Sequence, residues 1–244
     1  MVDAKFGVGR LAAVYDGFEP DRVDLEHYVA MVGEFAARRV VDVGCGTGVL
    51  ACLLARDGVD VIGVDPADAS LEVARGKEFA DRVRWIHGDA TTLPALEADL
   101  AVMTGNVAQV FLTDEEWDAT LRGVHAALAT DGRFVFETRD PAARVWEEWG
   151  KWTRENTYQV APVPDGGTVE TWGELLSVEL PFVSFRGTYV FSSDGAVLTS
   201  DSTLRFRERD ELEQSLTAAG FAVDDVRDAP DRPGKEFVFI ARRL

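Results

Sequence analysis

Glycines and carboxylates recur at fixed spacing near the start of the chain and could bind a nucleoside. Asp42 ends a valine-rich run and is followed at every second position by a glycine, at Gly44, Gly46 and Gly48. A second apolar run ends in Asp65. Glycine lets the backbone approach a ligand closely, and a carboxylate at the tip of the next strand can accept hydrogen bonds from both ribose hydroxyls. The spacing therefore predicts a ligand that contains a nucleoside.

The spacing of the glycines distinguishes two classes of nucleotide-binding protein. In the dinucleotide fingerprint G-x-G-x-x-G the third glycine lies five residues after the first, whereas here Gly48 lies four residues after Gly44 and is followed by Val49. The pattern D-x-G-x-G-x-G resembles motif I of the class I S-adenosylmethionine (SAM) dependent methyltransferases. An NAD-type dehydrogenase is the alternative among enzymes, and a non-catalytic SAM-binding protein is the alternative from another class.

A third segment extends the resemblance. Residues 82–90 end a strand pattern in Asp89 and Ala90. They resemble the place in these methyltransferases where an acid accepts from the adenine amino group and the next backbone N–H meets a ring nitrogen. The resemblance implies SAM as the cofactor. It assigns cofactor binding to Asp42, Gly44, Cys45, Gly46, Gly48, Asp65, Pro66, Asp89, Ala90 and Thr104.

Strand and helix patterns alternate around these motifs up to about residue 138. The expected elements are 40–43, 49–56, 59–64, 67–75, 83–87, 100–103, 115–128 and 134–138. Such alternation implies parallel strands joined by right-handed crossovers. Asp131-Gly132 is expected to end the fourth helix. The resemblance implies a Rossmann-like α/β fold whose seven-stranded sheet is mostly parallel, with an antiparallel last strand.

The pattern changes between about residues 157 and 207, which are rich in Thr, Val and aromatic residues. Turn signals stand at Asp165-Gly166-Gly167 and at Asp194-Gly195, and the second predicts a two-residue hairpin. We expect an antiparallel β insertion of three or four strands before the last helix. It resembles the architecture of small-molecule enzymes that N-methylate amino sugars.

The chain is accordingly predicted to have four parts. Residues 1–37 form a helical lead-in or lid, and residues 38–140 form the SAM-binding core. Residues 141–207 contain a helix and the β insertion, which covers the acceptor or contacts a twin subunit in a homodimer. Residues 208–244 supply the last helix and the last two core strands.

Three residues are candidates for work on the acceptor. Ligands on an open α/β sheet bind beyond the carboxyl ends of the strands, which is where Asn106 and Arg139 are expected. Asn106 could instead cap a turn, and Arg139 could pair with an acidic substrate group or form a surface ion pair. Tyr15 lies in a segment that resembles the N-terminal aromatic lid of the amino-sugar enzymes, with simple packing as its alternative.

Methyl transfer from an activated sulfonium requires alignment and exclusion of water more than it requires a catalytic triad. The three tryptophans at every third position, Trp146, Trp149 and Trp152, are expected to pack on a helix, with a lid over an apolar acceptor as the alternative. The three histidines show no spacing typical of a metal site. No metal is therefore expected.

The composition limits the partners. Forty-three acidic residues against 25 basic residues give a net charge of −18, which opposes binding to a phosphate backbone. No apolar run approaches the length of a membrane span, and the start of the chain lacks the layout of a signal peptide. Two closely spaced cysteines favour reduced thiols and a cytoplasmic location. The expected partner is a small-molecule acceptor, not a nucleic acid or a membrane.

Overall fold

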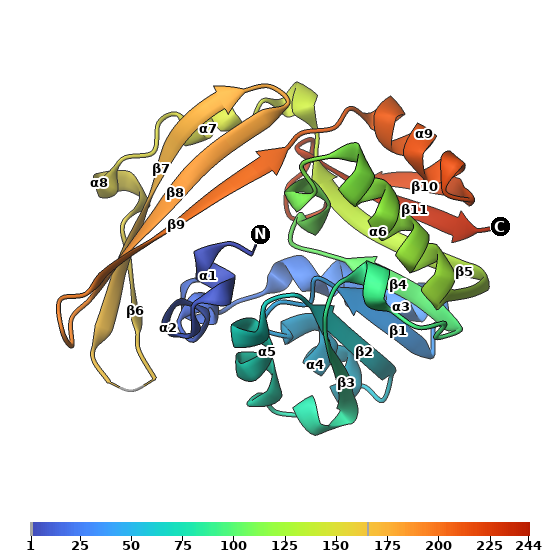
Figure 1. Cartoon of the computed structure of the whole chain (residues 1–244), viewed down its shortest axis with the longest axis horizontal. Helices are drawn as coiled ribbons and strands as arrows, with labels where there is room; N and C mark the ends of the chain where they lie inside the picture. Colours follow the sequence, from blue (N-terminus) through green and yellow to red (C-terminus); the bar gives the residue numbers. More distant parts are fainter. Residues whose placement is uncertain (1, 165) are drawn as a thin grey trace.

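The protein is described here from a computed structural model, which covers residues 2–164 and 166–244. Asp165, the first residue of the predicted turn at 165–167, lies outside the described residues. The strands form two separate sheets (Figure 1). Seven strands are ordered β10-β11-β5-β4-β1-β2-β3, and four are ordered β6-β7-β8-β9.

The larger sheet has the predicted topology. Its strands are β1 (Arg39–Val43), β2 (Asp60–Asp65), β3 (Val83–His87), β4 (Ala98–Met103), β5 (Leu128–Arg139), β10 (Phe221–Asp228) and β11 (Glu236–Arg243). The first five run parallel to one another, and β11 is antiparallel to both β5 and β10. Near-continuous apolar runs such as β1 and β4 are buried on both faces, as parallel strands require. The Rossmann-like α/β fold with an antiparallel last strand is confirmed.

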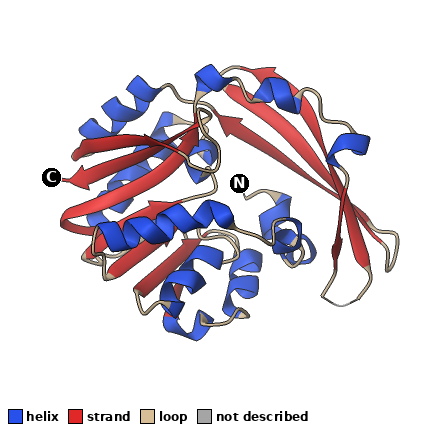
Figure 2. Ribbon diagram, turned by 180° about the vertical axis from the view of Figure 1, so that it is seen from behind, coloured by secondary structure: helices blue, strands red, loops and turns tan. Residues whose placement is uncertain are grey.

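Helices cover both faces of this sheet (Figure 2). The longer ones are α3 (Glu26–Glu34), α4 (Val49–Arg56), α5 (Asp68–Arg75), α6 (Asp114–Ala127) and α9 (Arg209–Ala218). Leu54 of α4 and Tyr28 of α3 pack with Val40 and Val61 in one apolar cluster. On the opposite face α6 and α9 form a second cluster with the alternate residues of the same strands.

Short helices lie before β1 and in several of the connections between strands. They are α1 (Ala4–Gly7), α2 (Gly9–Ala12), α7 (Trp146–Trp149), α8 (Arg154–Thr157) and the 3-10 turns η1 (Tyr15–Phe18), η2 (Val23–Leu25), η3 (Ala80–Arg82), η4 (Ala90–Thr92), η5 (Val107–Val110) and η6 (Pro141–Ala143). None of the helices in the described part of the chain is long and apolar enough to cross a membrane.

The predicted end of the fourth helix at Asp131-Gly132 is wrong. Helix α6 starts at a capping box formed by Thr113 and Glu116 and ends at Ala127, and β5 begins at the next residue. Asp131 has a φ of 61° and lies inside β5, where the register with β4 shifts. Asp131-Gly132 therefore marks an irregularity within β5. A residue with left-handed backbone is also typical of the end of a helix, which explains the wrong prediction.

The β insertion has four strands, all antiparallel, as expected. They are β6 (Gln159–Pro162), β7 (Thr168–Glu179), β8 (Phe182–Phe191) and β9 (Val197–Arg205). The predicted two-residue turn at Asp194-Gly195 is wrong, because Phe191 N–H donates to Ala196 O at 3.0 Å and the loop spans residues 192–195. Asp194 Oδ1 accepts from Ala196 N–H at 3.0 Å and closes this longer loop.

Residues 2–18 lie between the two sheets (Figure 1). We call α1, α2 and η1 the lid segment. Its Leu11 and Val14 are buried against Ala161, Val169 and Phe191 of the insertion. Polar contacts add to this apolar cluster, since Lys5 N–H donates to Ser200 Oγ of β9 at 2.9 Å. The lid segment is thus fixed to the insertion sheet.

Candidate active site

The loop between β1 and α4 contains the three glycines of the motif. Gly44, Gly46 and Gly48 all have positive φ values, of 73°, 55° and 77°. A Cβ at Gly44 would lie 2.7 Å from a methyl carbon of Val107, whereas a Cβ at Gly46 would meet no protein atom within 4 Å. The backbone at Gly46 therefore faces open space, where a ligand can approach it.

Asp65 lies directly beside this loop. Its Oδ2 accepts from Gly46 N–H at 2.8 Å, and its Oδ1 accepts from Ala67 N–H at 2.7 Å. Burial raises the pKa of Asp65. Each carboxylate oxygen can accept a further hydrogen bond, which is the requirement for holding two ribose hydroxyls. Pro66 follows and contacts His87 Nε2 through its carbonyl oxygen at 3.1 Å.

Asp42 is enclosed at the end of β1, only 2 % exposed. Burial raises the pKa of Asp42 to about 7, and the charge of Asp65 acts in the same direction, while the backbone N–H of Ala51 in α4 lowers it. The Ala51 amide that acts on Asp42 belongs to the first turn of the helix that follows the loop. Cys45 is half-buried in the same loop, and its N–H donates to Val64 O at 3.1 Å.

Asp89 and Ala90 stand at the end of the neighbouring strand, β3. Asp65 pairs with His87 in the β2–β3 register, so the acids at 65 and 89 lie on adjacent strand ends. Asp89 Oδ1 accepts from Thr91 N–H at 2.8 Å and caps η4. The structure therefore places two carboxylates, those of Asp65 and Asp89, at neighbouring strand ends beside the glycine loop.

Asn106 lies after β4 in a left-handed conformation, with a φ of 59°. It follows the half-buried Thr104 and is only 3 % exposed. Its N–H donates to Glu137 Oε1 at 3.1 Å, and its Nδ2 donates to Glu236 Oε1 at 3.0 Å. Its buried Oδ1 has no hydrogen-bond partner within the described ranges. Asn106 therefore occupies a turn and also belongs to a buried polar network.

Two glutamates of that network were not predicted. Glu137 and Glu236 lie on β5 and β11, where Glu236 pairs with Arg139 across the sheet. Tyr28 donates to Glu137 Oε2, and Arg232 donates to Glu236 Oε1 at 2.9 Å. Burial raises the pKa of Glu137, and the charge of Glu236 adds to this shift. Glu137 could have been found from the sequence, because it follows three apolar residues in a predicted strand.

Arg139 is not a surface ion pair, because its side chain is only 21 % exposed. Its Nη1 donates to Gln109 Oε1 at 2.8 Å, and its Nε lies 3.7 Å from Glu236 Oε1. The guanidinium stands over the ring of Trp149, 5.2 Å from its centroid. Burial lowers the pKa of Arg139. It therefore connects the core sheet to the aromatic residues beside the insertion.

The tryptophans form part of an aromatic cluster. Trp146 and Trp149 lie on α7, but Trp152 follows the helix, so the expected single helix is too short to carry all three. Trp149 stacks on Trp152 with ring centroids 5.5 Å apart and meets the edge of Phe185 at 5.6 Å. The packing interpretation is confirmed in that these rings contact each other and the insertion sheet.

The lid segment is also held to the glycine loop. Thr47 Oγ1 donates to Asp16 Oδ1 at 2.6 Å, and Lys77 at the end of α5 pairs with the same carboxylate. Tyr15 is half-buried, with its ring 5.3 Å from that of Phe6. Burial raises the pKa of Tyr15 to about 12. The structure therefore places Tyr15 beside the loop region, packed on its own segment.

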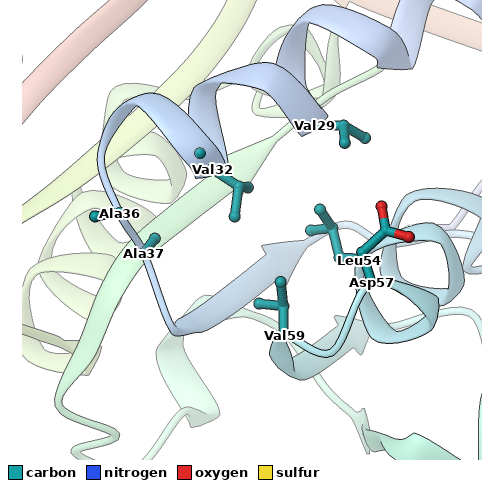
Figure 3. A pocket seen from close by; sticks show the side chains of 8 residues that line it. Val29, Val32, Ala36, Ala37, Leu54, Asp57 and Val59 are labelled. Atoms are coloured by element: carbon teal, nitrogen blue, oxygen red, sulfur yellow. The ribbon is translucent and has the colours of Figure 1, made fainter.

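A separate hollow lies at the opposite edge of the large sheet. Figure 3 shows Val32 of α3 and Leu54 of α4 facing each other across it, with Val59 below. Val59 directly precedes β2, so this pocket adjoins the amino end of the strand, whereas Asp65 ends it. The hollow is mostly apolar and lies away from the candidate site. The described ranges contain no group of three His, Cys, Asp or Glu residues suited to a metal ion.

Comparison with known proteins agrees with this geometry. Residues 40–132 match the methyltransferase domain family. The cypemycin N-terminal methyltransferase of Streptomyces sp. is 34 % identical over 43 % of this chain and 43 % of that protein.

Two solved structures show the fold over nearly the whole chain. The sugar N-methyltransferase from Streptoalloteichus sp. is 19 % identical, with a TM-score of 0.76 over 94 % of this chain and 92 % of that one. An amino pentose methyltransferase from Micromonospora echinaspora, solved with SAM, is 20 % identical, with a TM-score of 0.70 over 95 % of both chains. The chain therefore contains a methyltransferase domain at residues 40–132 and shares the fold of these methyltransferases over nearly its whole length.

Proposed function

We propose that the chain transfers the methyl group of SAM to an amine or hydroxyl group of a small-molecule acceptor. The observation that carries the proposal is that three parts of the chain meet at one edge of the large sheet. These are the glycine loop with Asp65, the strand ends with Asn106 and Arg139, and the lid segment with Tyr15. This edge carries the carboxyl ends of the parallel strands, where ligands of such sheets bind.

In this proposal the cofactor is held by residues that converge on the loop. Asp65 accepts from the ribose hydroxyls, with Pro66 shaping the turn, while Asp89 and the N–H of Ala90 meet the adenine. The aminoacyl end of SAM would be held by Gly44, Cys45, Gly46 and Gly48, with Asp42 and Thr104 close by. When bound, SAM supplies a methyl group already activated by the sulfonium.

The remaining work is alignment of the acceptor. Asn106 is held by hydrogen bonds to two buried carboxylates. Its Oδ1 is therefore already placed to accept a hydrogen bond from the attacking group of the substrate. Tyr15, with its raised pKa, stays protonated at neutral pH and can donate a hydrogen bond. A general base is needed only if the nucleophile carries a proton that must leave. Arg139 binds an acidic group of the acceptor.

Relatives support an amine or a hydroxyl as the nucleophile. Two structural neighbours are named as sugar or amino pentose methyltransferases, one of them an N-methyltransferase. A ubiquinone biosynthesis O-methyltransferase of Bordetella avium is 47 % identical, over 25 % of this chain. Both classes of acceptor therefore belong in the first screen.

The proposal is tested in two steps. Isothermal titration with SAM, S-adenosylhomocysteine (SAH) and NAD should show binding of the first two and none of NAD, whereas NAD binding would favour the dehydrogenase. A screen of small amines and hydroxyl compounds with radiolabelled SAM should then show acid-stable transfer of label. SAM binding with no transfer to any acceptor would favour the non-catalytic SAM-binding alternative.

We further propose a homodimer formed through the outer face of the insertion. Exposed apolar side chains occur at both ends of the insertion sheet, at Val160 and Val197 on β6 and β9 and at Leu176 and Leu180 near the β7–β8 turn. Light scattering should give twice the chain mass for the parent and a lower mass for Leu176→Lys. A monomeric parent would contradict the dimer. The two free cysteines support a cytoplasmic location, and the net charge opposes a nucleic acid or an anionic membrane as partner.

A further inference from the structure

Lys5, in α1 of the lid segment, is a charged residue that the proposed function does not use. Its Nζ stands 4.8 Å from the ring centroid of Phe6 and 5.3 Å from that of Phe185. Within residues 2–164 and 166–244, no carboxylate oxygen lies within 4.0 Å of this ammonium group. The side chain is half-buried, and burial lowers the pKa of Lys5.

Arg139 approaches the same aromatic rings from the core sheet. It stands over Trp149, and Trp149 meets the edge of Phe185. Phe185 therefore contacts Lys5 directly and Arg139 only through Trp149. The charge of Arg139 also lowers the pKa of Lys5, as expected for like charges that repel across a partly desolvated region.

None of the carboxylates near this pair forms an ion pair with Lys5 in the described residues, and Glu236 and Asp3 are engaged in other contacts, whereas the charge of Glu19 acts on both cations from a distance. Glu236 Oε1 lies 3.7 Å from Arg139 but also accepts from Asn106 and Arg232 at 3.0 and 2.9 Å. Asp3 and Glu19 raise the pKa of Lys5 without forming an ion pair with it, and Asp3 Oδ2 accepts from Ser202 Oγ at 2.5 Å. Two half-buried cations thus remain incompletely neutralised between the lid segment and the core.

We infer that Lys5 and Arg139 together bind an anionic group, a carboxylate or a phosphate, that the acceptor carries next to a planar ring. The inference rests on the proposed function and names its acceptor class. An anion between the two cations offsets their repulsion, and the guanidinium fork suits the planar or tetrahedral oxygens of such groups. The faces and edges of Phe6, Phe185 and Trp149 supply the apolar walls for the ring.

The test compares three probes that differ in charge. We use para-aminobenzoate, para-aminophenyl phosphate and the neutral para-aminobenzamide, titrated by NMR into protein saturated with SAH. At least one anion should bind about tenfold more tightly than the amide, the difference expected from one charge-assisted hydrogen bond. Whichever anion binds more tightly identifies the group as a carboxylate or a phosphate.

Variants locate the effect. In Lys5→Met and in Arg139→Met the anion should bind no more than about twofold more tightly than the amide, because a single partly exposed cation contributes little. Lys5→Arg should restore the parent's preference for the anion. Arg56→Met is the matched control, because Arg56 is half exposed on α4 and pairs with Asp57. It should keep the full preference. If Arg139→Met no longer binds SAH, the result for Lys5→Met alone tests the inference.

Several results would overturn the inference. They are equal binding of the anions and the amide to the parent, no detectable binding of any probe, or a preference that survives in Lys5→Met. Loss of the preference in Arg56→Met would overturn it as well. Failure of the proposed function looks different, since the parent would then fail to bind SAH before any probe is added.

Discussion

The buried Asp42 carboxyl beneath the glycine loop makes a quantitative prediction for Asp42→Asn. An unfolded aspartate titrates near 3.9, whereas burial raises the pKa of Asp42 in the folded protein to about 7. Between these values the folded state keeps a proton that the unfolded state has lost, so the free energy of unfolding falls as the pH rises. Asparagine is similar in size and cannot ionise, so the variant escapes this loss.

The size of the effect follows from the width of the window. Each pH unit in which only the folded state is protonated costs about 1.4 kcal/mol. From pH 5 to pH 7 the parent should therefore lose about 2 kcal/mol of stability relative to Asp42→Asn, because half of the folded carboxyls are already ionised at pH 7. Above the folded-state pKa both states are ionised, and the difference between the two proteins should level off.

Urea unfolding of the cofactor-free proteins at pH 5, 6, 7 and 8 measures this difference. Asp194→Asn is the control, because Arg10 lowers the pKa of Asp194 to about 2. That carboxyl is ionised in both states throughout the range, so its variant should differ from the parent by a constant amount. A constant difference for Asp42→Asn would show instead that Asp42 is ionised in the folded protein, and the reasoning from burial would be refuted.

Three further predictions concern ligands. Asp65→Ala should weaken SAH binding by about 1.5–3 kcal/mol per ribose hydrogen bond lost, measured by isothermal titration, and Asp89→Ala should weaken it less; an unchanged affinity of Asp65→Ala would contradict the cofactor assignment. Gly46→Val should abolish SAH binding but cost only about 1–2 kcal/mol in urea unfolding, the strain of its left-handed backbone, because its Cβ meets no protein atom; retained binding would place the cofactor elsewhere. Filter binding should detect no tRNA at near-physiological salt, and a signal that falls steeply with added salt would reveal an unrecognised basic surface.

The core could be predicted from the sequence because its signals are local. The three glycines and Asp65 lie within 22 consecutive residues of the sequence. The alternation of strands and helices restricts the topology of the sheet. The same locality explains the two errors. Asp131-Gly132 and Asp194-Gly195 both indicate left-handed or turn backbone, but only the strand partners decide where a strand starts and how long a loop becomes.

The polar network around Asn106 could not be predicted, since its partners are distant in the chain. Glu236 follows Asn106 by 130 residues, and they meet only because β11 pairs with β5 in one register. Glu137 carried a local signal, a charge in a buried strand, yet its partner Tyr28 comes from a helix on one face of the sheet. Lys5 likewise acquires its surroundings from the insertion, far along the sequence.

The position of the lid segment has a consequence for the thermodynamics of turnover. Asp16 attaches it to the cofactor loop through Thr47, while Leu11 and Val14 attach it to the insertion. Under the proposed function this one segment borders both ligands, so a ligand that holds the segment in its bound position leaves less entropy for the other ligand to lose. Because such coupling is reciprocal, SAM should tighten acceptor binding by the same factor by which the acceptor tightens SAM binding. The acceptor affinity that matters is then the one measured with the cofactor site filled.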